Sequence, residues 1–396
     1  VKGYYRGGMS GDSLITGIWT QLGRSSDLIM KKGAKPIVHN RPQEPKPPYP
    51  YREEEVTFMN PVENFSLAGT LTIPEGDGPF PAVILISGSG QQDRDETIFL
   101  HKPFLVLADY LTRNGIAVLR YDDRGMGKSK GRTNDATSLT FADDAEAALT
   151  YLLQRPEIDS RKIGLAGHSE GGLIAPIVAS RNRNVSFIVS LAGPGVKGYE
   201  VLLKQTQDIL AASGTSQAEI DETLASNSQL YRMVVEEPDL RKFAKDAMEW
   251  YGRELDALNL TQEERKEKMA SFTQGLVSIN SPWMRYFIAT DPAQFWSQVK
   301  CPVLALNGEK DLQVSQEINL PAIKAALRSG GNRKIKTVML PGLNHLFQHS
   351  ETGSPDEYVR IEETFSPAAL DLVSSWIRKT VRSEEHTSEL QSLRHL

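Results

Sequence analysis

A serine enclosed by glycines is the part of this chain best suited to chemistry. Residues 167–171 read Gly-His-Ser-Glu-Gly, between a short apolar run at 163–166 and a helix-like stretch at 173–179. This context is typical of a nucleophile elbow, in which Ser169 sits on a tight strand-to-helix turn where flanking side chains would collide. The alternative is an ordinary glycine-rich turn, because the bare pattern is common.

An acid and a histidine follow Ser169 in the order that an elbow-type triad requires. Asp311 comes shortly after the apolar run 303–306, and His345 comes shortly after the next run, 336–340. Taken singly, they are equally compatible with a solvated turn aspartate and a hydrogen-bonded loop histidine. Their joint placement beyond successive predicted strands favours a Ser-His-Asp triad.

The chemistry of a serine nucleophile explains why these three residue types are needed together. A serine hydroxyl is a weak nucleophile near neutral pH, so His345 must accept its proton and later return it to the leaving group. Asp311 would hold the correct tautomer of His345. The sequence therefore predicts a serine hydrolase that forms an acyl-enzyme on Ser169, and a catalytically dead binding protein is the alternative from another class.

An oxyanion hole needs two main-chain N–H groups. One is expected from Glu170, directly after the nucleophile. The second is expected from the loop 87–90, which follows the predicted strand 81–86. We assign it to Ser89, with Gly90 as the next candidate, and a plain glycine turn is the alternative.

Three segments resemble the α/β-hydrolase superfamily: residues 87–95, 121–129 and 167–172. The resemblance runs from about residue 53 to residue 380, and the segments look like those of bacterial esterases and serine aminopeptidase-like hydrolases. It implies hydrolysis of carboxylic esters without a metal or organic cofactor. We expect small-molecule esters with short to medium acyl groups, because nothing in the sequence resembles an extended lipid-binding surface. A peptidase or acyl-aminoacyl hydrolase, or a thioesterase, with the same triad remains the alternative.

The order of predicted elements fits that resemblance. Strands and helices alternate, which predicts an α/β-hydrolase fold with a mostly parallel central sheet covered by helices on both faces. The core is expected in two parts, residues 53–195 and 299–381. Between them, residues 196–298 are rich in helix formers and charge, and we expect a helical cap over the site. A helical decoration away from the site is the alternative.

An aromatic segment of the predicted cap is the candidate substrate-binding region. Trp283, Tyr286 and Phe287 could line an apolar pocket, and Arg285 could meet a carboxylate or bridge to an acidic neighbour. Plain core packing is the alternative for each of these residues.

The two ends of the chain differ from the core. Residues 1–35 are predicted as short strands joined by glycine turns, the remnant of an N-terminal β module, and residues 36–52 as a proline-rich linker outside either domain. The first segment resembles a module of relatives that are commonly exported, which favours a periplasmic or secreted location. Residues 382–396 resemble a translated sequencing adapter, and we expect this tail to pack on nothing.

Composition excludes several classes of protein. The chain has 396 residues and a formal net charge of −5, without a basic run of the kind that nucleic-acid binding requires. A single cysteine, Cys301, excludes a disulfide framework. The sequence contains no apolar stretch long enough to span a membrane. It does not predict the oligomeric state.

Overall fold

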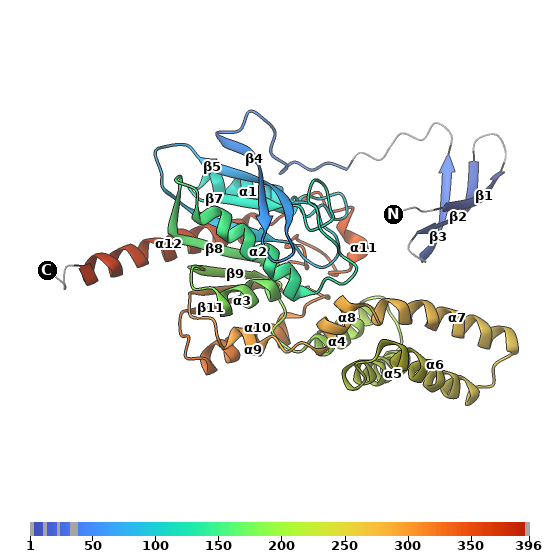
Figure 1. The fold of residues 1–396 in the computed structure, drawn as a ribbon. Coiled ribbons are helices and arrows are strands. Elements are labelled where there is room, and N and C mark those ends of the chain that lie inside the picture. The colour runs from blue at the N-terminus through green and yellow to red at the C-terminus, as the bar shows by residue number, and fades with distance from the viewer. Residues whose placement is uncertain (1–3, 11–13, 22–23, 32–38, 393–396) are drawn as a thin grey trace. The chain divides into compact units, whose positions relative to one another are not determined.

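The computed structural model describes residues 4–10, 14–21, 24–31 and 39–392. The chain divides into two compact units. The smaller contains residues 1–40 and 248–278, and the larger contains residues 41–247 and 279–396. Each unit is described by itself (Figure 1).

The larger unit is built on an eight-stranded sheet in the order β11-β10-β9-β8-β6-β7-β5-β4. Only the pairings of β4 with β5 and of β5 with β7 are antiparallel. The strands from β6 to β11 pair in parallel, so their carboxyl ends meet at one edge of the sheet. The bounds are β4 Tyr51–Asn60, β5 Phe65–Pro74, β6 Phe80–Ile86, β7 Ala117–Tyr121, β8 Ile158–His168, β9 Phe187–Leu191, β10 Val303–Gly308 and β11 Ile335–Leu340.

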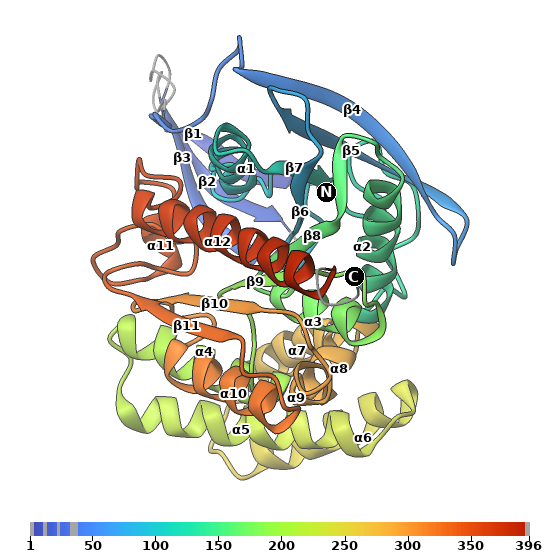
Figure 2. The same ribbon diagram turned by 90° about the vertical axis from the view of Figure 1, so that its left-hand side faces the viewer.

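Helices cover both faces of this sheet (Figure 2). Helices α1 (Pro103–Arg113) and α12 (Pro367–Ser392) share one hydrophobic cluster with alternate residues of the central strands. Helices α2 (Ser138–Leu153), α3 (Gly171–Arg181), α9 (Ala293–Trp296) and α10 (Gln316–Ser329) share the other. The predicted α/β-hydrolase fold is therefore confirmed. The predicted elements did not include α10 and α12.

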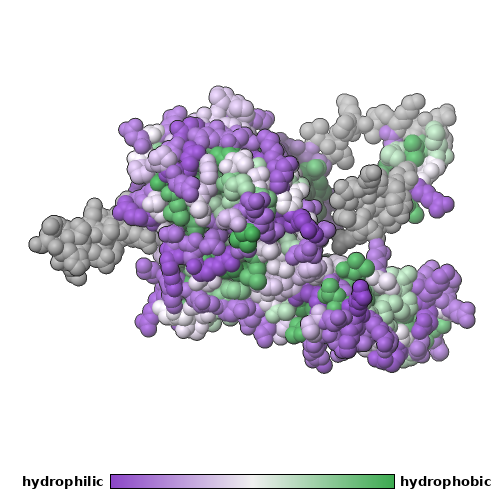
Figure 3. Space-filling view, viewed as in Figure 1, coloured by the Kyte–Doolittle hydropathy of each residue, from purple (hydrophilic) through white to green (hydrophobic). Residues whose placement is uncertain are grey.

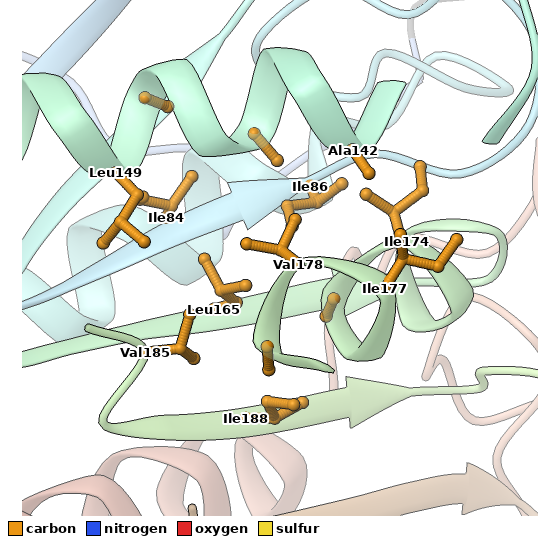
Figure 4. Close-up of a cluster of buried hydrophobic side chains, with 14 of the residues drawn as sticks. Ile84, Ile86, Ala142, Leu149, Leu165, Ile174, Ile177, Val178, Val185 and Ile188 are labelled. Atoms are coloured by element: carbon orange, nitrogen blue, oxygen red, sulfur yellow. The ribbon is translucent and has the colours of Figure 1, made fainter. Parts of the chain in front are cut away.

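The core beneath α2 and α3 shows why the parallel strands are nearly continuous apolar runs. Ile84 of β6 and Leu165 of β8 are fully buried against Leu149 of α2 and Val178 of α3 (Figure 4). Their neighbours along each strand, such as Val83 and Ala166, are buried in the cluster on the opposite face. A strand buried on both faces needs apolar side chains at successive positions.

Between β9 and β10 the chain forms helices, without a strand in residues 196–298. Helices α4 (Gly198–Ala212), α5 (Gln217–Glu236) and α8 (Pro282–Ala289) belong to the larger unit. Helix α6 (Leu240–Asp256) is divided between the units, and nearly all of α7 (Gln262–Ile279) belongs to the smaller one.

The smaller unit also contains three antiparallel strands in the order β1-β2-β3. Their bounds are β1 Tyr4–Ser10, β2 Leu14–Gln21 and β3 Arg24–Lys31. That these strands are the remnant of a larger β module stays a prediction.

The proline-rich segment makes specific contacts with the larger unit. The Arg41 guanidinium donates to the main-chain carbonyl oxygens of Leu100, Val359 and Ile361 at 3.0, 2.9 and 2.8 Å. Gln43 both donates to and accepts from the main chain of Phe365. Residues 36–52 are predicted as a linker outside both domains, whereas in the structure part of this segment joins two loops of the hydrolase core.

The C-terminal tail continues helix α12, which runs to Ser392. The side chains of residues 383–396 lie outside the described ones, so the expectation that this tail packs on nothing stays a prediction.

The face of the molecule seen in Figure 3 is mostly hydrophilic, with hydrophobic residues in small separate groups. Within the described part of the chain, no helix is both long and apolar enough to cross a membrane.

Candidate active site

The nucleophile elbow is a turn between β8 and α3. Ser169 has a φ of 52°, in the left-handed region that a residue with a side chain rarely adopts. Its main-chain N–H donates to the carbonyl oxygen of Leu191 at 2.8 Å, which ties the turn to the neighbouring strand. Backbone strain of this kind persists only where the surrounding structure imposes it, and it is concentrated at functional sites.

Glycines make this turn possible because the chain passes close to itself. A Cβ at Gly167 would lie 1.9 Å from the main-chain oxygen of Gly171. A Cβ at Gly171 would lie 2.1 Å from the main-chain oxygen of Ile86. Real Cβ atoms do not approach backbone atoms so closely, so any other residue would open the elbow.

Asp311 and His345 lie in the loops that follow β10 and β11, and both are buried. The Nδ1–H of His345 donates to Oδ2 of Asp311 at 2.9 Å. Oδ1 of Asp311 accepts the main-chain N–H groups of Gln313 and Val314 at 2.8 and 2.9 Å. The loop therefore fixes the carboxylate, and the carboxylate selects the tautomer of His345 in which Nε2 is the acceptor.

His168 connects the elbow to the loop that carries His345. Its Nε2–H donates to the main-chain oxygen of His345 at 3.0 Å, and the two imidazole rings lie 4.8 Å apart. Its Nδ1 lies 2.9 Å from Oε1 of Glu96, which is also buried. Burial lowers the pKa of His168, but the Glu96 carboxylate outweighs this effect and raises the pKa above its ordinary value.

The loop after β6 lies against the elbow. A Cβ at Gly88 would lie 3.2 Å from the Cβ of Ser169, so glycine allows this approach without displacing the serine. The Gly88 N–H donates to Oε1 of Glu96 at 2.7 Å. Of the two residues that follow, Ser89 borders the pocket beside Ser169, and Gly90 borders a smaller cavity.

A second acid, the half-buried Asp123, binds this loop. Oδ1 of Asp123 accepts the Ser87 hydroxyl at 2.7 Å, and Oδ2 accepts the Gln92 N–H at 2.8 Å. Burial raises the pKa of Asp123 to about 8, and the carboxyl groups of Glu170 and Glu96 contribute in the same direction. The charge of a group bonded to this loop therefore changes near neutral pH.

A pocket of about 170 Å³ borders Ser169. Helices α4 and α8 provide much of its wall, together with the elbow and the loop after β10. The apolar side chains in its lining are Pro194, Val201, Leu202, Trp283, Met284, Phe287 and Val314. Gln205 and Gln313 add neutral polar groups.

Residues 102–257 match the family described as Serine aminopeptidase, S33. The chain is 29% identical over 339 residues to Esterase EstD of Thermotoga maritima, and the match covers 84% of this chain and 69% of that protein. With this sheet and these similarities, the chain has the fold of the α/β-hydrolase superfamily. It is also 32% identical over 138 residues to Thiohydrolase aneE of Aspergillus aculeatus, covering 35% of this chain and 40% of that protein.

Among solved structures, the Pyrococcus furiosus esterase PF2001 is similar to this α/β-hydrolase with a TM-score of 0.49 and 17% identity. That likeness covers 87% of this chain and 99% of the esterase.

Two candidate substrate-binding residues of this α/β-hydrolase do not line the pocket. The Arg285 guanidinium donates to the main-chain oxygens of Val234, at 3.0 Å, and Glu237, and it lies 5.1 Å from the centroid of the Phe243 ring. The last carbonyl groups of helix α5 lack partners within the helix, and Arg285 satisfies them. Tyr286 is also absent from the lining, whereas its neighbours Trp283 and Phe287 belong to it.

The side-chain partners that hold the site of this α/β-hydrolase together could not be predicted from its sequence. Glu96 lies 72 residues before His168 in the chain, and no local sequence pattern predicts their contact. Like Ser169, Glu96 has a positive φ, 51°, which sequence does not reveal in a residue other than glycine. Within the described residues, no group of three potential metal-ligating side chains comes together.

Proposed function

We propose that this α/β-hydrolase cleaves carboxylic esters through an acyl-enzyme formed on Ser169. The observation that carries the proposal is the position of Ser169, on a strained turn that borders a largely apolar pocket. The pairing of His345 with Asp311 supports the same chemistry. Similarity to Esterase EstD supports an ester as the substrate class.

In the first half of the proposed reaction, Oγ of Ser169 attacks the ester carbonyl carbon while Nε2 of His345 takes the hydroxyl proton. The carbonyl oxygen becomes an oxyanion, which receives hydrogen bonds from the N–H groups of Glu170 and Ser89. The tetrahedral intermediate then collapses. The bond to the alkoxy group breaks, His345 returns the proton to the leaving alcohol, and the acyl group remains on Ser169.

In the second half, water attacks the acyl-enzyme and His345 takes its proton. A second tetrahedral intermediate forms in the same oxyanion hole. Its collapse releases the carboxylic acid and returns the proton to Oγ of Ser169. Asp311 stabilises the imidazolium that forms in each half of the cycle, without itself being protonated.

The lining of the pocket favours a neutral acyl group. Its charged residue, Glu170, is buried, and its Oε1 already accepts hydrogen bonds from Ser138 and Trp283, so little of the carboxylate faces a substrate ammonium group. Among the described residues that line the pocket, none has a cationic side chain to bind a substrate carboxylate. Burying an unpaired charge is costly, and this disfavours both an aminopeptidase substrate and a dicarboxylic half-ester.

A thioesterase is the second candidate, favoured by the similarity to Thiohydrolase aneE. The same serine, histidine and acid would act, and a thiol would leave in place of an alcohol. The acyl pocket makes no distinction between the two reactions, because they differ only in the leaving group.

The test is hydrolysis of p-nitrophenyl esters from acetate to palmitate by the full chain and by Ser169→Ala, with S-phenyl thiobutyrate and an alanyl p-nitroanilide as competing substrates. We expect ester hydrolysis that is lost in the variant, and labelling of the parent protein alone by a fluorophosphonate probe. Activity that survives in Ser169→Ala would point to another nucleophile. Amide cleavage as fast as ester cleavage would overturn the esterase in favour of a peptidase.

A further inference from the structure

The carboxyl group of Glu170 makes hydrogen bonds that the proposed role of its main-chain N–H does not require. Its main-chain N–H belongs to the proposed oxyanion hole, but its carboxyl group turns to other partners. Oε1 accepts the indole N–H of Trp283 at 2.7 Å and the hydroxyl of Ser138 at 2.6 Å. The residue is only 3% exposed, and burial raises its pKa.

Trp283 is the partner that lines the pocket. It stands in the first turn of α8, where Pro282 occupies the first helical position and the Ser281 hydroxyl accepts the N–H of Met284. Its indole stacks on the Phe287 ring, with centroids 5.7 Å apart and an interplanar angle of 12°. Both rings line the pocket beside Ser169.

These contacts fix the indole from two directions. Stacking on Phe287 sets the plane of the ring, and the hydrogen bond to Glu170 sets its rotation within that plane. A hydrogen bond to a carboxylate is about twice as strong as one between neutral groups, and here the acceptor residue is buried. The wall formed by α8 is thus tied directly to the residue that follows the nucleophile.

The volume of the pocket indicates how long an acyl chain it can hold. A cavity of about 150 Å³ lined by apolar side chains holds a benzene molecule. The pocket beside Ser169 is about 170 Å³. On that scale it accepts an acyl chain of about six carbons, or one phenyl ring, before the chain meets the opposite wall.

We propose that Glu170 is a specificity-determining positioning residue, whose carboxyl group holds the Trp283 indole as the wall that limits the length of the acyl chain. The proposal rests on the esterase function above and adds the device that sets its acyl range. Longer acyl chains are excluded because the indole cannot turn aside while its N–H is bound to Glu170.

The test compares kcat/KM for p-nitrophenyl butyrate and decanoate across a set of full-chain variants. Glu170→Ala removes the acceptor, and Trp283→Phe removes the donor while keeping an aromatic ring. Both should raise the decanoate-to-butyrate ratio at least tenfold. Glu170→Gln retains an amide oxygen that can accept the indole N–H, so we expect it to restore most of the parent preference.

Two further variants separate this role from general support of the fold. Ser138→Ala removes the other donor to Glu170 and should leave the ratio near that of the parent protein. In Glu170→Ala/Trp283→Phe, loss of the carboxyl group should add nothing to the change made by Trp283→Phe alone. If Glu170→Ala does not fold, the comparison of Trp283→Phe with the parent and with Ser138→Ala still tests the wall.

An equal loss of activity on both esters in Glu170→Ala and Trp283→Phe would overturn the proposal, as would an unchanged ratio in a folded Trp283→Phe. These outcomes differ from failure of the esterase itself. In that case the parent protein would neither hydrolyse p-nitrophenyl butyrate nor react with a fluorophosphonate at Ser169.

Discussion

His168 donates a hydrogen bond from Nε2 to the main-chain oxygen of His345, across 177 positions of the chain. Its other ring nitrogen meets Glu96, and the same carboxylate oxygen of Glu96 accepts the N–H of Gly88. One buried pair therefore contacts the elbow, the loop of the proposed base and the loop of the proposed oxyanion hole. The relative placement of these three loops depends on His168 and Glu96, although neither contacts the substrate in the proposed reaction.

We expect His168→Phe to lower kcat about tenfold, which corresponds to the loss of one charge-assisted hydrogen bond worth about 1.4 kcal/mol. The phenyl ring keeps a flat aromatic side chain at this position, somewhat larger than the imidazole, but donates no proton to His345 or Glu96. KM for p-nitrophenyl butyrate should change less than kcat, because the pocket itself is not altered. Steady-state kinetics at saturating ester separates the two parameters.

The same pair predicts a pH dependence of stability. The folded-state pKa of His168 is raised, so the pair stabilises the fold fully below about pH 6.5, the ordinary histidine value, and less as the pH rises through the raised pKa. His168→Phe/Glu96→Gln removes both charges, so its melting temperature should fall less than that of the parent above pH 6.5. Parallel curves for the two proteins would contradict a charged pair.

Asp311→Asn should reduce kcat by about 10⁴-fold, as in serine proteases where the same exchange leaves the geometry intact. The asparagine oxygen would still accept the N–H groups of Gln313 and Val314, which now bind Oδ1 of Asp311. Its amide NH₂ would face Nδ1 of His345 and select the tautomer whose Nε2 carries a proton. A stopped assay at high enzyme concentration measures the residual rate, and a fall of less than tenfold would argue against Asp311 as the acid.

Asp123→Asn should flatten the dependence of stability on pH. Burial raises the folded-state pKa of Asp123 to about 8, so the folded protein keeps a proton that the unfolded chain releases. The free energy of unfolding therefore decreases as the pH rises from about 4 to about 8, and this contribution is level above that range. The asparagine amide can still bond Ser87 and Gln92, so urea unfolding at pH 5, 7 and 8.5 compares two folded proteins.

The sequence constrains the candidate site most where one side chain follows one strand. Ser169, Asp311 and His345 each stand after an apolar run, and the carboxyl ends of parallel strands meet at one edge, so topology assigns all three to that edge. The role of Arg285 could not be inferred in this way, because the carbonyl groups it satisfies become visible only once the end of α5 is placed beside α8. Arg41 bonds to Ile361 across 320 residues from within a segment whose prolines indicate only an extended linker.

Arg41→Ala should lower the free energy of unfolding by about 2 kcal/mol. The substitution removes the charged guanidinium, and several main-chain carbonyl oxygens then lack a hydrogen-bond donor. The affected loops contain Leu100 and residues 359–361. Arg132→Ala is the matched control, since Arg132 is 80% exposed and pairs with an equally exposed Asp135. Exposed pairs contribute little, so the control should unfold like the parent. Equal urea midpoints for both variants would show that the segment is a passive linker.

Gly167→Ala should abolish activity and reduce the yield of folded protein. The added methyl carbon would lie 1.9 Å from the oxygen of Gly171, a main-chain atom that cannot move without opening the turn of Ser169.

Gly275→Ala is the matched control, since a Cβ there meets nothing within 4 Å and the residue lies inside α7. Alanine is favoured over glycine in a helix by up to about 1 kcal/mol, so the control should melt at the same or a higher temperature with unchanged kcat. The two variants carry the same chemical change, so a difference between them reports the space at the elbow. A folded, active Gly167→Ala would mean that the turn relaxes without displacing the nucleophile.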